Sequence, residues 1–230
     1  MEADAESPHT GLFIQPSEED NTYVGAWNVR SHFAVGKAAQ VAREMEMNRC
    51  EIIVLSEMRW GGLERMKLTT GQTLLFSCRK DNLHRQGVGM LMSGNATKAL
   101  VSWKLVNERI ITARFYSKYV KTTMTQIYAR TEDSSEEDKD DCCEQLQTVI
   151  NTIPKHDIKV IVGDCNAKVG EDNMGREEVM GKHGVGVRND NGSRLVDFCD
   201  YNNLVITGTC FPHKENHKLT WRSPDRQTLN

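Results

Sequence analysis

The chain has 230 residues, of which 38% are hydrophobic and 27% are charged, and its formal net charge is −3. This size and balance are typical of a soluble globular protein with one ordinary domain or two small ones. No stretch approaches the ~20 consecutive apolar residues that a membrane span needs, and residues 1–20 lack the basic and apolar regions of a targeting peptide. We therefore expect an intracellular protein, nuclear or cytoplasmic, with no membrane partner.

Acidic residues are concentrated in two short segments. Residues 1–20 hold six acidic and no basic residues, and residues 132–141 hold seven acidic residues and one lysine, so the remaining 200 residues carry a net charge of +9. A basic body is compatible with a polyanionic partner such as nucleic acid, although the net charge of the whole chain argues against one.

The seven cysteines do not form the pattern of a disulfide framework or of a zinc site. Their number is odd, no Cys-x-x-Cys pair occurs, and the seven histidines are scattered along the chain. We expect reduced thiols and no zinc.

The first part of the chain predicts a strand, a helix and a second strand. Residues 1–20 are polar and acidic, which predicts a disordered leader before a single domain over residues 21–230. A strand is expected at residues 22–29. Residues 36–49 have apolar side chains spaced as on one face of a helix, and the apolar run at 51–57 predicts a strand buried on both faces.

The pattern then changes to strands without helices between them, which favours antiparallel pairing over residues 73–130. Further along, we expect elements in the following order: a helix at 140–152, a strand at 158–163, a long glycine-rich loop at 167–192, a helix at 193–201 with Asn191 as its N-cap, a strand at 204–207 and the start of another at 218–221. The sum is a mixed α/β (α+β) chain with much antiparallel sheet.

Polar residues stand at the ends of several predicted strands. Asn28 ends the first, Glu57 the second, and Asp164 with Asn166 follows the strand at 158–163, while Tyr128 ends another. Each has an ordinary structural alternative, because Asn28 could turn the chain, Glu57 could pair with a neighbouring arginine and Asp164 could cap a turn. Loops at strand ends are nevertheless where a rigid sheet presents chemistry.

Taken together, these residue types suit metal-assisted hydrolysis of a phosphate ester. Mg²⁺ prefers oxygen ligands and often binds through one or two carboxylates, which Glu57 and Asn28 could supply. Asp164 could accept a proton from water while Asn166 orients it, and the phenol of Tyr128 could donate a hydrogen bond to a phosphate oxygen.

Seven motifs occur in a characteristic order: WNVR, IIVLSEMRW, IYAR, VIVGDCNAKVG, RNDNGSRLVDFC, YNNLVITGT and LTWRSPDRQT. Over about residues 21–230 the chain resembles the endonuclease/exonuclease/phosphatase superfamily. More narrowly, it resembles the endonuclease domains of non-LTR retrotransposons and the craniofacial development protein-like endonucleases related to them.

The resemblance implies a four-layer αββα sandwich, with two packed sheets and helices outside, and Mg²⁺-dependent cleavage of a DNA phosphodiester, with Mn²⁺ as an alternative ion. By motif, Glu57 binds the metal with Asn28 beside it, Tyr128 contacts the scissile phosphate, Asp164 positions or deprotonates the attacking water, and Asn166 orients it. A reverse transcriptase domain in a full-length element is a candidate partner.

Two residues within these motifs, Trp60 and Arg30, are candidates for contacting substrate. Trp60 could stack on a base or a sugar, or could equally be a core residue at the sheet edge. Arg30 occupies the position where abasic-site nucleases of the superfamily carry a second acidic residue. This difference favours the retrotransposon type of endonuclease. It also leaves Glu57 as the one clear carboxylate ligand for a metal ion.

The resembled fold closes with further strands that carry an aspartate and then an Asp–His pair, and the sequence stops at Asn230 before any of them. We therefore expect a fragment that is inactive or weakly active by itself. Two alternatives stay open, namely a non-catalytic retroelement remnant with residual affinity for nucleic acid, and a phosphatase or phosphodiesterase of the same superfamily. Target-site preference and oligomeric state are not predicted.

Overall fold

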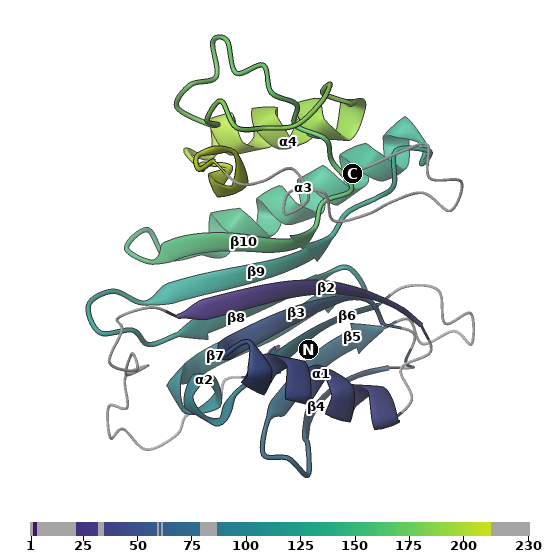
Figure 1. The fold of residues 1–230 in the computed structure, drawn as a ribbon, viewed down its shortest axis with the longest axis vertical. Helices are drawn as coiled ribbons and strands as arrows, with labels where there is room; N and C mark the ends of the chain where they lie inside the picture. Colours follow the sequence, from purple (N-terminus) through teal and green to yellow (C-terminus); the bar gives the residue numbers. More distant parts are fainter. Residues whose placement is uncertain are drawn as a thin grey trace. The chain divides into compact units, whose positions relative to one another are not determined.

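The computed structural model describes residues 2–3, 22–31, 35–58, 60, 62–78 and 87–212 (Figure 1). The chain divides into two compact units. The first unit comprises Met1–Ala129 and Leu146–Asp164, and the second comprises Arg130–Gln145 and Cys165–Asn230.

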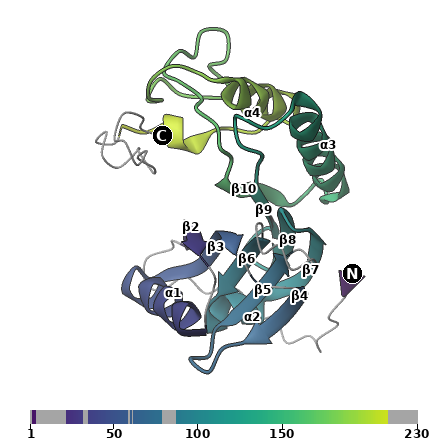
Figure 2. The same cartoon turned by 90° about the vertical axis from the view of Figure 1, so that its right-hand side faces the viewer.

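The first unit contains two sheets, each with five strands among the described residues (Figures 1 and 2). The strands of one sheet are, in spatial order, β1 (Glu2–Ala3), β7 (Leu100–Asn107), β8 (Ile110–Phe115), β9 (Thr122–Tyr128) and β10 (Ile158–Asp164). The strands of the other are β2 (Tyr23–Ser31), β3 (Cys50–Met58), β6 (Gly87–Met92), β5 (Thr73–Cys78) and β4 (Leu63–Lys67).

Both sheets are mixed. The pairs β9–β10 and β2–β3 are parallel, and the remaining neighbours are antiparallel. This confirms the predicted α/β class and the antiparallel pairing expected between residues 73 and 130. The parallel pairs matter for the site, because the carboxyl ends of parallel neighbours lie at the same edge of a sheet.

A hydrophobic core joins the inner faces of the two sheets. Ile52 and Val54 on β3 share a buried cluster with Ile111, Ala113 and Phe115 on β8. The contributing residues alternate along each strand, as expected when one face of each sheet packs against the other. The two packed sheets of the predicted sandwich are therefore confirmed.

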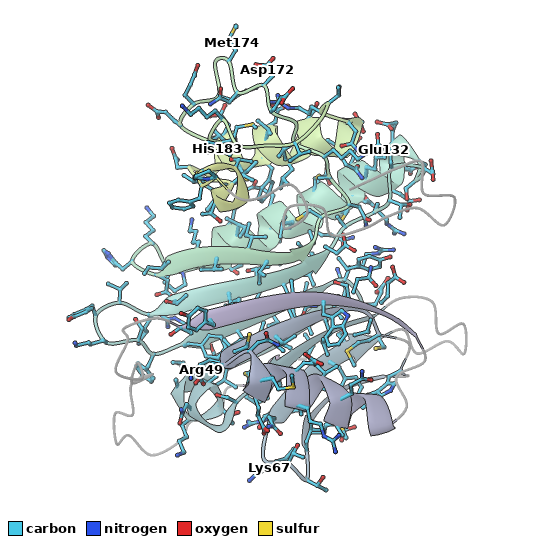
Figure 3. The ribbon with its side chains drawn as sticks, in the orientation of Figure 1. Arg49, Lys67, Glu132, Asp172, Met174 and His183 are labelled. Atoms are coloured by element: carbon cyan, nitrogen blue, oxygen red, sulfur yellow. The ribbon has the colours of Figure 1, made fainter. Side chains whose placement is uncertain are left out.

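Helix α1 (Val35–Met47) covers the outer face of the β3 sheet. Its apolar stripe, which includes Val41 and Met45, is buried against Leu55 and Leu74. The stripe predicted from the sequence is thus the face that packs. The chain leaves the helix through Arg49, which has a φ of 52° and reverses direction into β3 (Figure 3).

Helix α3 (Glu136–Thr152) begins four residues earlier than the sequence predicts. Its first turn consists of acidic residues, so much of the run at 132–141 belongs to the helix and is not a separate acidic segment. Negative charge at a helix N-terminus is favourable because it faces the positive end of the helix dipole. The short helix α2 (Gly94–Ala99), which the sequence did not indicate, is capped by the Ser93 side chain.

In the second unit, helix α4 (Asp190–Tyr201) is capped by Asn189 rather than by the predicted Asn191. The Asn189 side chain accepts hydrogen bonds from the amides of Gly192 (2.8 Å) and Lys168 (2.9 Å). The side chain of Asn191 instead donates to the carbonyl groups of Arg130 and Asn166, each at 3.0 Å.

The predicted strand at 204–207 is wrong. Ile206 makes an isolated bridge to Met180, and the chain then enters the short 3₁₀ helix η1 (Thr207–Thr209). The apolar residues of this segment pack instead on a small cluster that includes Val196 and Cys199 of α4. The glycine-rich loop is folded over that cluster, with Asp172 and the exposed Met174 at its tip (Figure 3).

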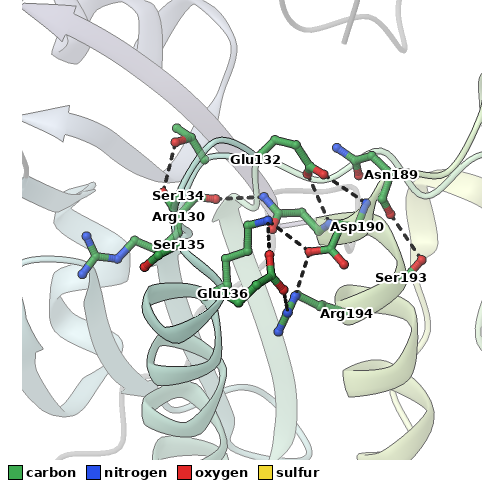
Figure 4. Close-up of polar contacts among 12 residues, drawn as sticks. Arg130, Glu132, Ser134, Ser135, Glu136, Asn189, Asp190, Ser193 and Arg194 are labelled. Atoms are coloured by element: carbon green, nitrogen blue, oxygen red, sulfur yellow. Dashed lines mark hydrogen bonds and ion pairs between the residues drawn. The ribbon is translucent and has the colours of Figure 1, made fainter.

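Ion pairs hold α4 to the first turns of α3 within the second unit (Figure 4). Arg194 pairs with Glu136 and Asp190, and the buried Lys139 lies 3.1 Å from the same two carboxylates. The neighbouring Arg194 and Lys139 hold the pKa of Asp190 below its usual value. The Glu132 carboxylate accepts from the first amides of α4 at 3.2 and 3.3 Å, as expected for an anion at a helix N-terminus.

Three further predictions concern the two ends of the chain and the possibility of a membrane span. Glu2–Ala3 pair with β7, while the rest of the predicted leader and the strand expected at 218–221 lie outside the described residues. Among the described residues, no helix is both long and apolar enough to cross a membrane.

Candidate functional site

Four of the residues singled out in the sequence come together in the first unit. Asn28 lies on β2 and Glu57 on β3, whereas Tyr128 and Asp164 are the last residues of β9 and β10. Asp164 is paired with Tyr128 in the parallel register of β9 and β10, and Asn28 is paired with Ser56, the neighbour of Glu57. The two parallel strand pairs, one in each sheet, therefore supply all four side chains.

The amide of Asn28 connects the two carboxylates. Its Nδ2 atom donates to Oε1 of Glu57 at 2.7 Å and to Oδ2 of Asp164 at 2.8 Å. The hydroxyl of Tyr128 donates to the same Oε1 atom of Glu57 at 3.3 Å. We refer to Asn28, Glu57, Tyr128 and Asp164 as the carboxylate cluster.

The backbone of Glu57 is in an unusual conformation. Its φ is 57°, in the left-handed region that non-glycine residues rarely occupy, and it lies between the buried Ser56 and Met58. Such a conformation costs on the order of 1–3 kcal/mol and persists where surrounding packing holds it, often at functional sites.

Gly163, the residue before Asp164, allows β10 to approach β9 closely. It has a φ of 141°, and a β-carbon there would lie 2.0 Å from the carbonyl oxygen of Ile127. Because other residues rarely adopt this φ and would clash with the neighbouring backbone, the Gly-Asp sequence is a requirement of the local structure. It fixes Asp164 beside Tyr128.

A buried glutamine links the two sheets beneath the carboxylate cluster. Gln126 has no exposed surface, and its side-chain nitrogen donates to the carbonyl oxygen of Leu55, two residues before Glu57. The sequence analysis did not identify it. Along the strand, Gln126 alternates with Met124 and Tyr128, whose side chains face the core between the sheets. A polar residue at such a position, where an apolar one is usual, could have identified it from the sequence.

The phenol of Tyr128 lies in a largely dehydrated environment. Burial, followed by the negative charge of Glu57, raises the pKa of Tyr128 to about 12, although the nearby positive charge of Arg109 lowers it in part. Desolvation and a like charge both disfavour the phenolate. Tyr128 is therefore a protonated hydrogen-bond donor throughout the physiological pH range.

The remaining predicted residues are placed differently. Asn166 lies in the second unit, has a φ of 47° and offers its backbone carbonyl to Asn191. Trp60 is half-buried and packs edge-on against Phe76, with ring centres 5.0 Å apart, beside the cluster on the outer face of the β3 sheet. Arg30 lies in β2, and its side chain is outside the described residues.

The donors in the carboxylate cluster fit a hard divalent cation with few protein ligands. One side-chain amide contacts two carboxylates, and within the described ranges no group of three or more His, Cys, Asp or Glu residues is arranged to hold a metal ion. Mg²⁺ commonly uses one or two carboxylates and retains several waters, whereas Zn²⁺ prefers nitrogen and sulfur ligands.

Most of this chain can be aligned with curated proteins of similar sequence. No protein-family model matches it. It is 36% identical to craniofacial development protein 2 of Bos taurus over 202 residues, and 35% identical to that of Tragulus javanicus over 202 residues; both matches cover 88% of this chain. The chain spans about a third of the length of these relatives, at 33% and 34%. The two-sheet sandwich is the architecture that the ordered motifs imply.

Three solved structures match the fold of this chain, each at a TM-score below 0.5. The endonuclease domain of TRAS1, a telomere-specific non-LTR retrotransposon, matches with a TM-score of 0.49 and 14% identity, over 78% of this chain and 71% of that one. An endonuclease/exonuclease/phosphatase family protein from Leptotrichia buccalis C-1013-b matches with a TM-score of 0.47 and 12% identity, over 64% of this chain and 67% of that one. Danio rerio TDP2 in complex with a single-strand DNA product matches with a TM-score of 0.43 and 11% identity, over 65% and 61%.

Proposed function

We propose that the carboxylate cluster is the catalytic centre of a Mg²⁺-dependent endonuclease that hydrolyses a phosphodiester bond of DNA. One observation carries this proposal: the Asn28 amide holds the Glu57 and Asp164 carboxylates together, 2.7 and 2.8 Å away, beside the phenol of Tyr128. The cluster thus combines oxygen ligands for a cation, a proton acceptor and a neutral hydrogen-bond donor.

Glu57 and Asn28 would hold Mg²⁺, with Mn²⁺ as an alternative. The bound ion supplies positive charge against the phosphate oxygens, where negative charge develops during hydrolysis. The left-handed backbone of Glu57 and the Gln126 contact with Leu55 keep this carboxylate in a defined position. A rigid position reduces the reorganisation needed when an ion and substrate bind.

Asp164 and Tyr128 would act on the water and on the phosphate. The Asp164 carboxylate is oriented by the Asn28 amide and can accept the proton of an attacking water. The phenol of Tyr128 is protonated at physiological pH, and its pKa is raised further to about 12, so it can donate to a non-bridging phosphate oxygen. The orienting role of Asn166 stays a prediction from the sequence.

DNA as the substrate is supported by the motif order. The retrotransposon-type motifs favour an endonuclease over the phosphatase alternative.

The test combines ion binding with plasmid nicking. Mn²⁺ binding is followed by the loss of the free-ion electron paramagnetic resonance signal, and nicking is followed on supercoiled plasmid with Mg²⁺ and excess protein. We expect Glu57→Gln to weaken Mn²⁺ binding at least about tenfold, because it removes the main charged ligand. We expect Asp164→Asn to abolish nicking while the protein stays folded.

Glu64→Gln is the matched control, because Glu64 is an exposed glutamate on β4 of the same first unit. It should leave both measurements unchanged. A wild-type chain that binds no Mn²⁺ and leaves the plasmid intact contradicts the proposal. Hydrolysis of para-nitrophenyl phosphate without nicking would instead support the phosphatase alternative.

A further inference from the structure

Arg109 is a buried arginine next to the carboxylate cluster. It lies in the turn between β7 and β8, and the residue is 7% exposed. Removing a guanidinium from water is costly unless its contacts compensate, so a buried arginine normally has a defined structural task.

The contacts of Arg109 converge on one short segment of main chain. Its Nη1 atom donates to the carbonyl oxygens of Tyr128 (2.9 Å) and Ala129 (3.1 Å). In the opposite direction, the amide of Tyr128 donates to the carbonyl oxygen of Arg109 at 2.9 Å. The turn is itself fixed, because the amide of Arg109 donates to the Asn107 side chain at 2.8 Å.

The guanidinium also packs on the ring of Tyr128. Its central carbon lies 4.9 Å from the ring centre, within the range of a cation–π contact. The same side chain therefore restrains Tyr128 through its backbone and through its ring.

The position of Tyr128 in the sheet explains why such a restraint matters. Tyr128 is the last residue of β9, and the next residue, Ala129, makes one more backbone bond, from its amide to the carbonyl oxygen of Asp164 at 2.9 Å. Strand ends lose the support of the ladder and fray first. Arg109 supplies donors to both carbonyl groups at the point where the ladder stops.

We propose that Arg109 is a positioning residue that fixes the direction of the Tyr128 phenol by holding the carbonyl groups of Tyr128 and Ala129 and stacking on the ring. The catalytic consequence rests on the proposed function, because Tyr128 contacts the phosphate only if the carboxylate cluster is a phosphodiesterase site. The structural consequence, a fixed ring, does not depend on it.

Lysine cannot perform this task, although it carries the same charge. The guanidinium is planar, has five donors in a rigid fork and stacks on aromatic faces, whereas the ammonium group is a compact point charge on a flexible stem. Arg109→Lys therefore separates geometry from charge.

The first readout is the ring environment of Tyr128 in the whole 230-residue chain. Tyrosine is labelled with ¹³C in the ring, and the Tyr128 signal is assigned by its disappearance in Tyr128→Phe. We expect Arg109→Lys to shift and broaden this signal. Arg114→Lys is the control, since Arg114 lies on β8, the strand that follows the Arg109 turn, and is paired with Asp157 at 2.7 Å. This substitution should leave the Tyr128 signal unchanged.

The second readout is the nicking rate in a double-mutant cycle. With protein in excess, we expect Arg109→Lys to lower the single-turnover rate constant at saturating protein about 10- to 100-fold, since misplacement of a reacting group affects the chemical step. The protein concentration that gives the half-maximal rate should change little. In the Tyr128→Phe background the same substitution should change this rate constant less than about twofold, because residues that act through one another are not additive. Equal effects in both backgrounds would overturn the proposal.

The two proposals fail in different ways. An unshifted Tyr128 signal in Arg109→Lys overturns the positioning role, whether or not the protein cuts DNA. A shifted signal in a protein that neither binds Mn²⁺ nor nicks plasmid supports the positioning role and contradicts the proposed function. If Arg109→Lys does not fold, Tyr128→Leu tests the contact from the other side, and an unchanged ¹⁵Nε signal of Arg109 in that variant would overturn it.

Discussion

Replacing Gly163 with alanine should destabilise the first unit and disturb the carboxylate cluster together. The new methyl group would lie 2.0 Å from the carbonyl oxygen of Ile127 and 3.0 Å from its carbonyl carbon and its amide nitrogen, at a φ of 141°. Backbone atoms cannot yield as a flexible side chain would, so β10 must move away from β9. Positive-φ strain of about 1–3 kcal/mol and the loss of one or two backbone hydrogen bonds of about 1 kcal/mol each sum to about 3 kcal/mol.

For a domain of this size, a loss of about 3 kcal/mol lowers the melting temperature by roughly 6–12 °C. Circular dichroism melts and urea titrations measure it directly. The control is Gly94→Ala, since Gly94 is the first residue of α2 and a β-carbon there meets no atom within 4 Å. That change should be neutral or stabilise the protein by up to about 1 kcal/mol. A Gly163→Ala protein that melts within 1 °C of the wild type would refute the close-approach argument.

Three further predictions concern other parts of the structure. Asp157 accepts hydrogen bonds from Arg114 (2.7 Å, twice) and Thr123 (2.6 Å), so Asp157→Asn should cost about 3 kcal/mol at pH 7 in urea titrations. Arg114 lowers the pKa of Asp157; since the folded pKa is below the unfolded value of about 3.9, the difference between wild type and variant should persist down to about pH 4 and disappear as the pH falls further. Phe115 is 1% exposed between the sheets, so Phe115→Ala should cost about 3–5 kcal/mol, measured in the same titrations against wild type. Asn189→Ala removes the cap of α4 and should speed amide hydrogen exchange in its first turn by about tenfold, with no change in the exchange of β9.

Strand β3 and the first helix could be predicted because their patterns are local. The stripe that includes Val41 and Met45 has the period of a helix, and the apolar run of β3 has the length and composition of a buried strand, so each element follows from neighbours in the sequence. The segment at 204–207 has similar composition but makes only the isolated bridge of Ile206, because its side chains pack on α4 and not in a sheet. Local pattern does not distinguish those two outcomes.

Helix boundaries were missed for a related reason. Asn189 and Asn191 are both good capping residues, and the choice between them depends on the amide of Lys168, which is distant in sequence. The acidic run before residue 140 repels itself as an isolated segment. In the folded second unit Arg194 and Lys139 pair with Glu136, which makes a helical start favourable.

The sequence by itself determined the class of the fold, the motif order and the four residue types of the carboxylate cluster, because these depend on short-range patterns and on chemistry that each side chain carries alone. Only the tertiary structure decided that Asn28 contacts both Glu57 and Asp164, that Gln126 links the sheets, and that Arg109 supports Tyr128. The contacts of Asn28 with Asp164 and of Gln126 with Leu55 join the two sheets, over separations of up to 136 positions, and they form only when these sheets pack face to face. Distance and orientation across a packed core are properties of the whole first unit, and no segment of the chain carries them separately.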